Sequence, residues 1–101
     1  MDINEIVSRI SYFRVQSNLS ARELSLLIGK SESYINHLES KPFNLKINVV
    51  LDIIAALNVT CEKFFSENYR SYDKDIEILN IIKSVPEDRK KNLIDLIKHI
   101  K

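Results

Sequence analysis

The sequence predicts an all-α protein with seven helices, and three observations support this fold class. Apolar residues recur every three or four positions through most of the 101 residues, as they do along one face of an α-helix. No segment shows the strict alternation of apolar and polar residues that is typical of a half-buried strand. Residues that cap helix N-termini precede several of the apolar segments.

Composition and charge narrow the possible classes of protein. Apolar residues make up 45% of the chain, enough for a core, and the net charge of +1 gives no overall attraction for nucleic acid. No apolar segment is long enough to span a membrane, and the acidic start does not resemble a signal peptide. The single cysteine, Cys61, fits a reducing cytoplasm and a place in the core. Because there is no Cys/His cluster, we expect a cytoplasmic protein without a metal site or cofactor.

Two capping boxes mark the first two helices. Asp2 and Glu5 begin the first helix, whose apolar face comprises Ile3, Ile6, Val7, Ile10 and Phe13. Ser20 and Glu23 begin the second helix, whose apolar residues are Leu24, Leu27 and Ile28.

Gly29, the only glycine in the chain, lies between the second helix and a third over residues 31–40, which Ser31 can cap. A glycine at this point can end one helix in the left-handed conformation and let the next leave at a steep angle. Two short helices joined in this way are typical of a helix-turn-helix, although many αα-hairpins share the pattern.

Four further helices are predicted after this turn. Residues 47–57 carry Ile47, Val50, Leu51 and Ile54 at helical spacing, and Thr60 can cap a short helix that ends at Phe65. We assign residues 1–66 to one domain, the polar residues 67–72 to a linker, and residues 73–101 to a C-terminal hairpin of two helices. The hairpin bends at Val85-Pro86, and Pro86 suits the first turn of the last helix.

The third helix has an unusual polar face. At 100° per residue Ile35 and Leu38 point one way, and the opposite face comprises Ser33, Asn36, His37 and Ser40. Short, uncharged, hydrogen-bonding side chains suit contacts with base edges in a DNA major groove. The alternative is that this face is an ordinary polar surface.

Residues 6–65 resemble the phage-repressor family of helix-turn-helix proteins, also called Cro or lambda-repressor-like, or XRE. IVSRISYFRVQSN is similar to the first helix of the family, LSARELSLLIGKSESYINHLE to helices two and three, and NVVLDIIAALNVTCEKFF to helices four and five. Apolar spacing, caps and Gly29 agree in register without a gap. The family often has glycines at the positions of Asn18, Lys41 and Asn58, and asparagine tolerates the left-handed region better than other residues.

The resemblance implies sequence-specific binding of double-stranded DNA, usually as a dimer that represses transcription, with helix three in the major groove. The residues expected to contact bases are Glu32, Ser33, Asn36 and His37. The residues expected to contact phosphates are Ser20, Arg22, Lys30, Ser31, Lys41, Asn44 and Lys46. The resemblance also implies a structural ion pair between Arg14 and Glu39. Helix three lacks Arg and Lys, and Ala21 replaces a glutamine common in the family, so we expect modest affinity for random DNA.

Two other functions remain open. The scaffold can serve as a protein-interaction module, either an antagonist of a related regulator or an antitoxin, and Leu26 favours this because it lies outside the apolar stripe of helix two. The alternative for Leu26 is that the C-terminal helices cover it. An enzyme is disfavoured, since His37 and His99 have no nearby cysteine or paired carboxylates.

The C-terminal helices have apolar arcs wider than one packed face requires, about 220° for residues 73–84 and about 160° for the last helix at 100° per residue. We expect a homodimer that binds a pseudo-palindromic operator, with half-sites one DNA turn apart and no membrane partner. The residues expected at the dimer interface are Ile76, Leu79, Ile82, Leu93, Ile97 and Ile100. The alternative is that both helices fold back onto their own domain.

Overall fold

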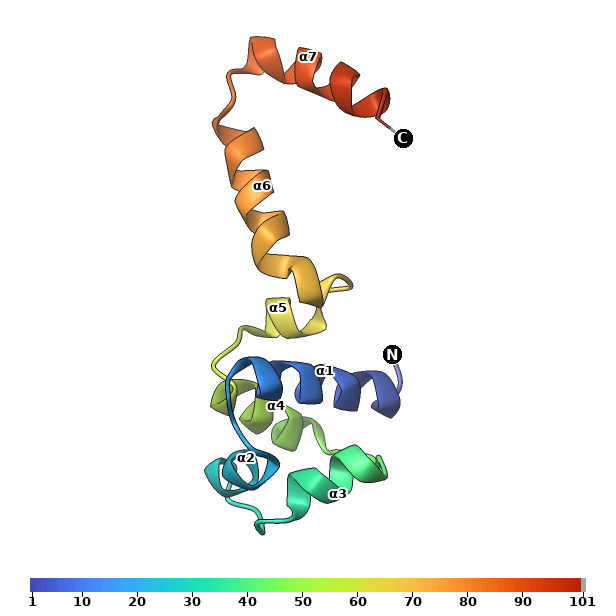
Figure 1. Ribbon diagram of the computed structural model, residues 1–101, viewed down its shortest axis with the longest axis vertical. Coiled ribbons are helices and arrows are strands. Elements are labelled where there is room, and N and C mark those ends of the chain that lie inside the picture. Colours follow the sequence, from blue (N-terminus) through green and yellow to red (C-terminus); the bar gives the residue numbers. More distant parts are fainter. Residues whose placement is uncertain (101) are drawn as a thin grey trace. The chain divides into compact units, whose positions relative to one another are not determined.

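The computed structural model describes residues 1–100, and within this range it is all-α, with no strand, as predicted (Figure 1). Its elements in chain order are α1 (Ile3–Gln16), α2 (Ala21–Leu27), α3 (Tyr34–Ser40), α4 (Ile47–Ala56), α5 (Cys61–Phe65), the 3-10 turn η1 (Tyr69–Ser71), α6 (Tyr72–Ser84) and α7 (Glu87–Lys98). The chain divides into two compact units, Met1–Tyr69 and Arg70–Lys101. No helix within residues 1–100 is long and apolar enough to cross a membrane.

The first unit has its own hydrophobic core, made by one face of each of its five helices. Its buried apolar residues are Val7, Ile10, Phe13, Leu24, Ile35, Leu38, Val50, Ile53, Ile54, Leu57 and Phe64. Burial of each such side chain stabilises the fold by roughly 1.5–3 kcal/mol. Because every one of these residues precedes Tyr69, the first unit does not depend on the second for its core.

The predicted caps are largely present. Ser20 accepts a hydrogen bond from the backbone N–H of Glu23 at 3.0 Å, and the Glu23 carboxylate accepts one from the N–H of Ser20 at 3.0 Å, which completes a capping box. The hydrogen bond from the Ser20 backbone N–H to the carboxylate, followed by a bond with the Ser20 side chain, lowers the pKa of Glu23. Asp2 accepts from the N–H of Glu5 at 3.0 Å, which is one half of a box. Thr60 caps α5 as predicted.

Within residues 1–100, three residues adopt the left-handed conformation, and the sequence analysis indicated all three. Gly29 has φ +73°, Asn18 has φ 56° and Asn58 has φ 57°. Lys41, the remaining position at which the family often has glycine, has φ −143° and therefore needs no glycine. Within residues 1–100, each position that needs positive φ is therefore filled by glycine or asparagine.

Several apolar residues predicted on buried faces are exposed. On α4 the buried stripe is Val50, Ile53 and Ile54, whereas Ile47 and Leu51 are 69% and 46% exposed. At 100° per residue Leu51 lies about 60° beyond Ile54, at the edge of that stripe. Ile47 lies on the same side of the helix as Ile54 but is the first residue of α4, at the end of the stripe. Leu27 is the last residue of α2 and is 61% exposed. Cys61, expected in the core, is exposed at the start of α5.

The first unit continues three residues into the segment expected to be a linker. The ring of Tyr69 packs edge-on against Tyr12 at 5.3 Å and lies 5.7 Å from Phe13. Arg9 is buried, with 7% of the residue exposed. Its guanidinium group donates to the carbonyl oxygens of Phe64 and Ser66 and lies 4.4 Å from the centre of the Tyr69 ring. Arg9 therefore satisfies backbone acceptors at the end of α5 and holds the segment that follows.

The two predicted C-terminal helices are present, but they do not form the predicted hairpin. α6 and α7 do not pack along each other and diverge at Val85 and Pro86 (Figure 1). Both residues are extended, with ψ 134° and 146°. No residue of either helix is buried. Within residues 70–100 the second unit therefore has no core of its own.

Candidate nucleic-acid interface

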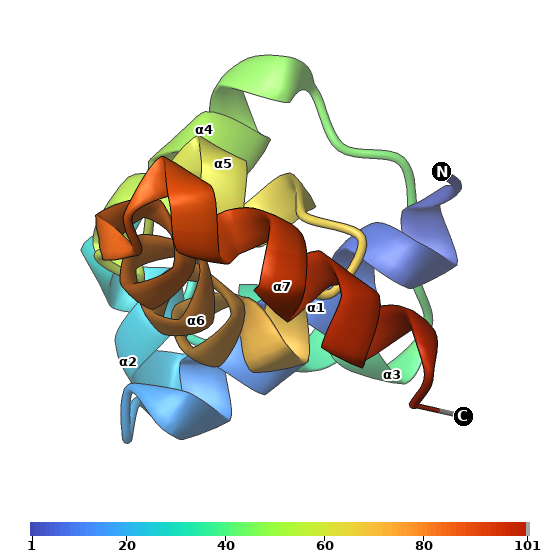
Figure 2. The same ribbon diagram turned by 90° about the horizontal axis from the view of Figure 1, so that it is seen from above.

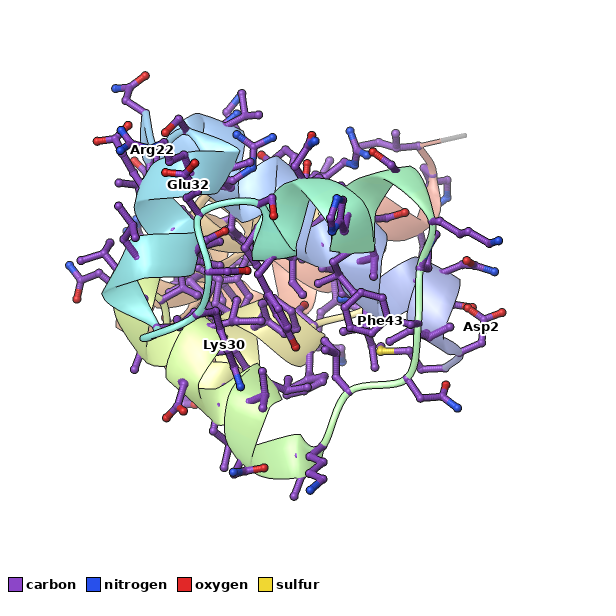
Figure 3. All side chains as sticks on the ribbon, turned by 90° about the horizontal axis from the view of Figure 1, so that it is seen from below. Asp2, Arg22, Lys30, Glu32 and Phe43 are labelled. Atoms are coloured by element: carbon purple, nitrogen blue, oxygen red, sulfur yellow. The ribbon has the colours of Figure 1, made fainter. Side chains whose placement is uncertain are left out.

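Helices α2 and α3 pack against each other and present α3 at the surface of the first unit. Ile35 and Leu38 of α3 are fully buried, as is Leu24 of α2. Figure 3 views the unit from the side on which α3 and the loop after it lie in front. Burial of one side of α3 fixes the rotation of the helix, so its other side faces outward.

Ser25 of α2 fixes the start of α3. Its side chain is fully buried, donates to the carbonyl of Ala21 at 2.7 Å and accepts from the backbone N–H of Ile35 at 2.9 Å. The N–H of Ile35 is one of the first-turn donors that a helix cannot satisfy internally. Sequence reasoning missed this residue, although a serine next to Leu24, on the apolar stripe of a short helix, was a detectable signal.

The prediction that Ser31 caps helix three is wrong, because α3 begins at Tyr34. Ser31, Glu32 and Ser33 lie in the turn before the helix, and Ser33 makes no side-chain capping bond. Ser25 supplies the bond that a cap would otherwise make. Three residues expected within the third helix therefore precede it.

The outer face of α3 comprises Asn36, His37 and Ser40, and Ser33 immediately precedes the helix. Asn36 and His37 are exposed, and their side chains form no hydrogen bond within residues 1–100. Ser40 donates its hydroxyl to the carbonyl of Asn36 at 2.7 Å. The side-chain amide and the imidazole are thus the groups of this face that can bond to another molecule.

The loop between α3 and α4, residues 41–46, is extended and tied to α3 (Figure 2). Phe43 packs edge-on against Tyr34 with ring centres 5.6 Å apart, and the ammonium of Lys30 lies 5.4 Å from the centre of the Tyr34 ring. Partial burial raises the pKa of Tyr34. Sequence reasoning missed Phe43, a lone aromatic in a polar loop. Its contact holds the loop that carries the exposed residues Lys41, Asn44 and Lys46.

Within residues 1–100 no group of three or more His, Cys, Asp or Glu residues is placed to hold a metal ion. The exposed features of this surface are the hydrogen-bonding side chains of Asn36 and His37 on α3 and the lysines of the neighbouring loop, Lys41 and Lys46. A family model described as helix-turn-helix matches residues 10–64, more than half of the chain. The chain belongs to the XRE helix-turn-helix family. Searches of curated proteins and of solved structures found no match.

As a member of the XRE family the chain is a DNA-binding regulator with the Cro and lambda-repressor type of fold. Two ion pairs connect the residues predicted for its site. Arg22 of α2 and Glu32 of the turn are paired at 3.1 Å, with side chains 69% and 66% exposed (Figure 3). Exposed pairs of this kind contribute about 0–1 kcal/mol. Arg22 and Glu32 were predicted to contact phosphate and base respectively, and in the free protein each is bonded to the other.

The second pair in this XRE domain is structural. Arg14 of α1 donates Nε and Nη2 to the two carboxylate oxygens of Glu39, each at 2.8 Å, and donates Nη1 to the carbonyl of Leu19 at 2.9 Å. The two side chains are 17% and 18% exposed. The hydrogen bonds that Arg14 donates to the Glu39 carboxylate raise the pKa of Arg14. This bidentate pair ties the end of α3 to α1 and to the start of α2.

Proposed function

We propose that this chain is a transcriptional regulator that binds double-stranded DNA in a sequence-specific way by inserting α3 into the major groove. One observation carries the proposal: Asn36 and His37 stand exposed and unbonded on a helix whose other side is locked by Ile35 and Leu38. An asparagine amide can bond to the N6 and N7 of adenine, and a histidine N–H can donate to guanine.

The flanks of α3 offer the contacts that seat such a helix on the backbone. Lys41, Asn44 and Lys46 are exposed on the loop that Phe43 holds against α3. The other residues expected to contact phosphates precede α3 in the chain, and they are Ser20, Arg22, Lys30 and Ser31. Contacts of this kind fix position and carry no sequence information. A regulator seated on its operator excludes other proteins from the same DNA, which supports a role as a repressor.

Replacing Asn36 and Lys46 separately should distinguish base contacts from phosphate contacts. On a duplex obtained by site selection, Asn36→Ala should cost about 1–3 kcal/mol and relax the preference at one base position. Lys46→Ala should weaken binding to all DNA sequences to the same extent. It should also reduce the slope of log K, the association constant, against log salt concentration by about one. Fluorescence anisotropy titrations at several salt concentrations measure both. Equal losses on selected and random duplexes for Asn36→Ala would remove Asn36 from base recognition.

Removing the charge of Glu32 should strengthen binding to random DNA. Glu32→Gln removes a carboxylate from the interface and releases Arg22, so affinity for a random duplex should rise severalfold, by about 0.3–1 kcal/mol. The matched control is Glu62→Gln on α5, because Glu62 is also exposed but lies on a different helix. If Glu62→Gln strengthens binding as much as Glu32→Gln, the effect reflects net charge and Glu32 lies away from the phosphates.

We infer further that two copies act together, through the second unit. Residues 70–101 are too few to form a stable domain alone, and large apolar side chains are exposed on this unit at Ile78, Leu79, Ile81, Ile94, Leu96, Ile97 and Ile100. Covering these half-exposed side chains in two copies contributes on the order of 10–20 kcal/mol before the cost of association. Of the six residues predicted at the interface, Leu79, Ile97 and Ile100 are exposed, and Ile76, Ile82 and Leu93 are half-buried.

A second candidate function, binding of a protein partner, is favoured by one surface of the first unit. Leu26 and Leu27 are 53% and 61% exposed and border an open depression of about 420 Å³ with Leu19 and Glu23. Exposed apolar patches of this kind often mark protein contacts. A Leu26→Ser variant that keeps full operator affinity but loses capture of an antagonist or toxin would support this function.

A further inference from the structure

The Arg22–Glu32 pair joins a residue expected to contact phosphate to a residue expected to contact a base. Arg22 lies in the first turn of α2, and Glu32 lies in the turn before α3 (Figure 3). Their contact is a single hydrogen bond from Nε of Arg22 to Oε2 of Glu32, at 3.1 Å, between side chains that are 69% and 66% exposed. An ion pair in such surroundings changes an equilibrium by no more than about fivefold. The pair is therefore weak enough to open when each side chain has a better partner.

The neighbouring charged groups do not compete for either member of this pair. The residues from Ser20 to Ser40 that can carry charge near neutral pH are Arg22, Glu23, Lys30, Glu32, His37 and Glu39. Glu23 belongs to the capping box of α2, and Glu39 belongs to the partly buried pair with Arg14. The ammonium of Lys30 lies over the ring of Tyr34. Within residues 1–100, Arg22 is therefore the side chain that holds Glu32 in the free protein.

A carboxylate in the major groove discriminates among the four bases. An ionised carboxylate only accepts hydrogen bonds. Guanine presents two acceptors in this groove, thymine presents an acceptor and a methyl group, and adenine presents its amino donor beside an acceptor. Cytosine presents the N4 amino donor with no acceptor on its own base. Opposite cytosine Glu32 can replace its bond to Arg22, whereas opposite guanine or thymine it gains nothing by leaving Arg22.

We propose that Glu32 exchanges Arg22 for the N4 amino group of a cytosine when the protein binds its operator, and that the released Arg22 bonds to a phosphate. Where guanine or thymine occupies that position, the pair stays closed and the carboxylate keeps the charge of Arg22 neutralised. This exchange rests on the binding of α3 in the major groove proposed above. Phosphate contacts by themselves carry no sequence information. The exchange makes one phosphate contact depend on one base, so Arg22 becomes a specificity-determining residue.

A double-mutant cycle on DNA binding tests the exchange in the full chain. It compares the wild type, Arg22→Ala, Glu32→Ala and the double variant, and its coupling measures how much the interaction between the two residues changes on binding. One duplex is the product of site selection. The others each carry N4-methylcytosine in place of one cytosine. That base uses its remaining amino hydrogen to pair with guanine, so a methyl group replaces the major-groove donor.

The coupling should appear only where the cytosine donor is present. On the selected duplex the pair opens, so the double variant should lose about 2- to 5-fold more affinity than the product of the two single losses. On the duplex methylated at the cytosine that faces Glu32, the pair stays closed and this excess should vanish. Methylation there should weaken binding of the wild type and leave the affinity of Glu32→Ala unchanged. Fluorescence anisotropy titrations measure all of these affinities.

The Glu87–Lys90 pair of α7 is the matched control, because it is a surface pair bonded at 2.9 Å on a helix for which no DNA contact is proposed. Its cycle should give the same coupling on every duplex. Single losses for Arg22→Ala and Glu32→Ala that multiply without excess on the selected duplex would overturn the exchange, and so would an excess that no methylated cytosine removes. Both results would leave the proposed function standing. A wild-type chain that selects no site and binds every duplex alike would overturn sequence-specific binding and the exchange together.

Discussion

Replacement of Arg14 by alanine should lower the free energy of unfolding of the first unit by about 3 kcal/mol. The substitution removes two charge-assisted bonds to Glu39 and one bond to the carbonyl of Leu19, and it leaves the Glu39 carboxylate partly buried without its partner. This loss of unfolding free energy lies at the low end of the range for buried ion pairs, because about a sixth of each side chain is exposed. In a unit of this size the melting temperature should fall by about 12–24 °C.

Arg22→Ala is the matched control for this prediction. Arg22 is also paired with a glutamate through Nε, but the two side chains are 69% and 66% exposed. Its loss should change the free energy of unfolding by less than about 1 kcal/mol. Thermal denaturation followed by circular dichroism compares the two variants directly. Equal melting temperatures for Arg14→Ala and Arg22→Ala would show that the buried pair does not hold α3 to α1.

Deletion of the second unit should lower the affinity for a two-half-site operator by about 10²- to 10⁴-fold. A chain of residues 1–71 keeps the whole core and the packing of Tyr69, so it should retain its helices and bind a single half-site as well as the full chain does. It loses the link that makes binding of the second half-site intramolecular. Parallel titrations of one-half-site and two-half-site duplexes measure the difference.

The half-site titration is the control for damage to the DNA-binding unit. If the truncated chain loses affinity for both duplexes equally, the deletion has damaged the domain itself. If it binds the two-half-site duplex as tightly as the full chain, the second unit does not join two copies on DNA.

The elements of the first unit could be predicted because local chemistry determines them. Gly29 was identifiable as a left-handed position because it is a glycine between two helical patterns, and Asn18 and Asn58 were identifiable because the family often has glycine at those positions. The capping box of Ser20 and Glu23 involves residues three apart, and sequence spacing reveals such pairs.

The start of α3 could not be predicted, because a contact between helices decides it. Ser31 is a plausible cap by local rules, but Ser25 reaches across from α2 to the N–H of Ile35. Arg9 is a similar case, since its acceptors at Phe64 and Ser66 lie more than fifty residues away. Apolar periodicity identified α6 and α7, but their divergence depends on the backbone of Val85 and Pro86. Polar side chains that bond across long sequence separations leave little local signal.

The most direct test of major-groove recognition by α3 is a titration of the full chain against modified versions of its selected duplex. Replacing single purines by their 7-deaza analogues removes the N7 acceptor from the major groove, and replacing guanine by inosine removes only the minor-groove amino group. Loss of N7 at the positions facing α3 should weaken binding of the wild-type chain by about 1–3 kcal/mol. At the base that Asn36 contacts, the same loss should have little further effect on the affinity of the Asn36→Ala variant. Inosine should leave affinity unchanged. Full affinity for every 7-deaza duplex, with weaker binding to the inosine duplexes, would contradict the proposal that α3 binds in the major groove.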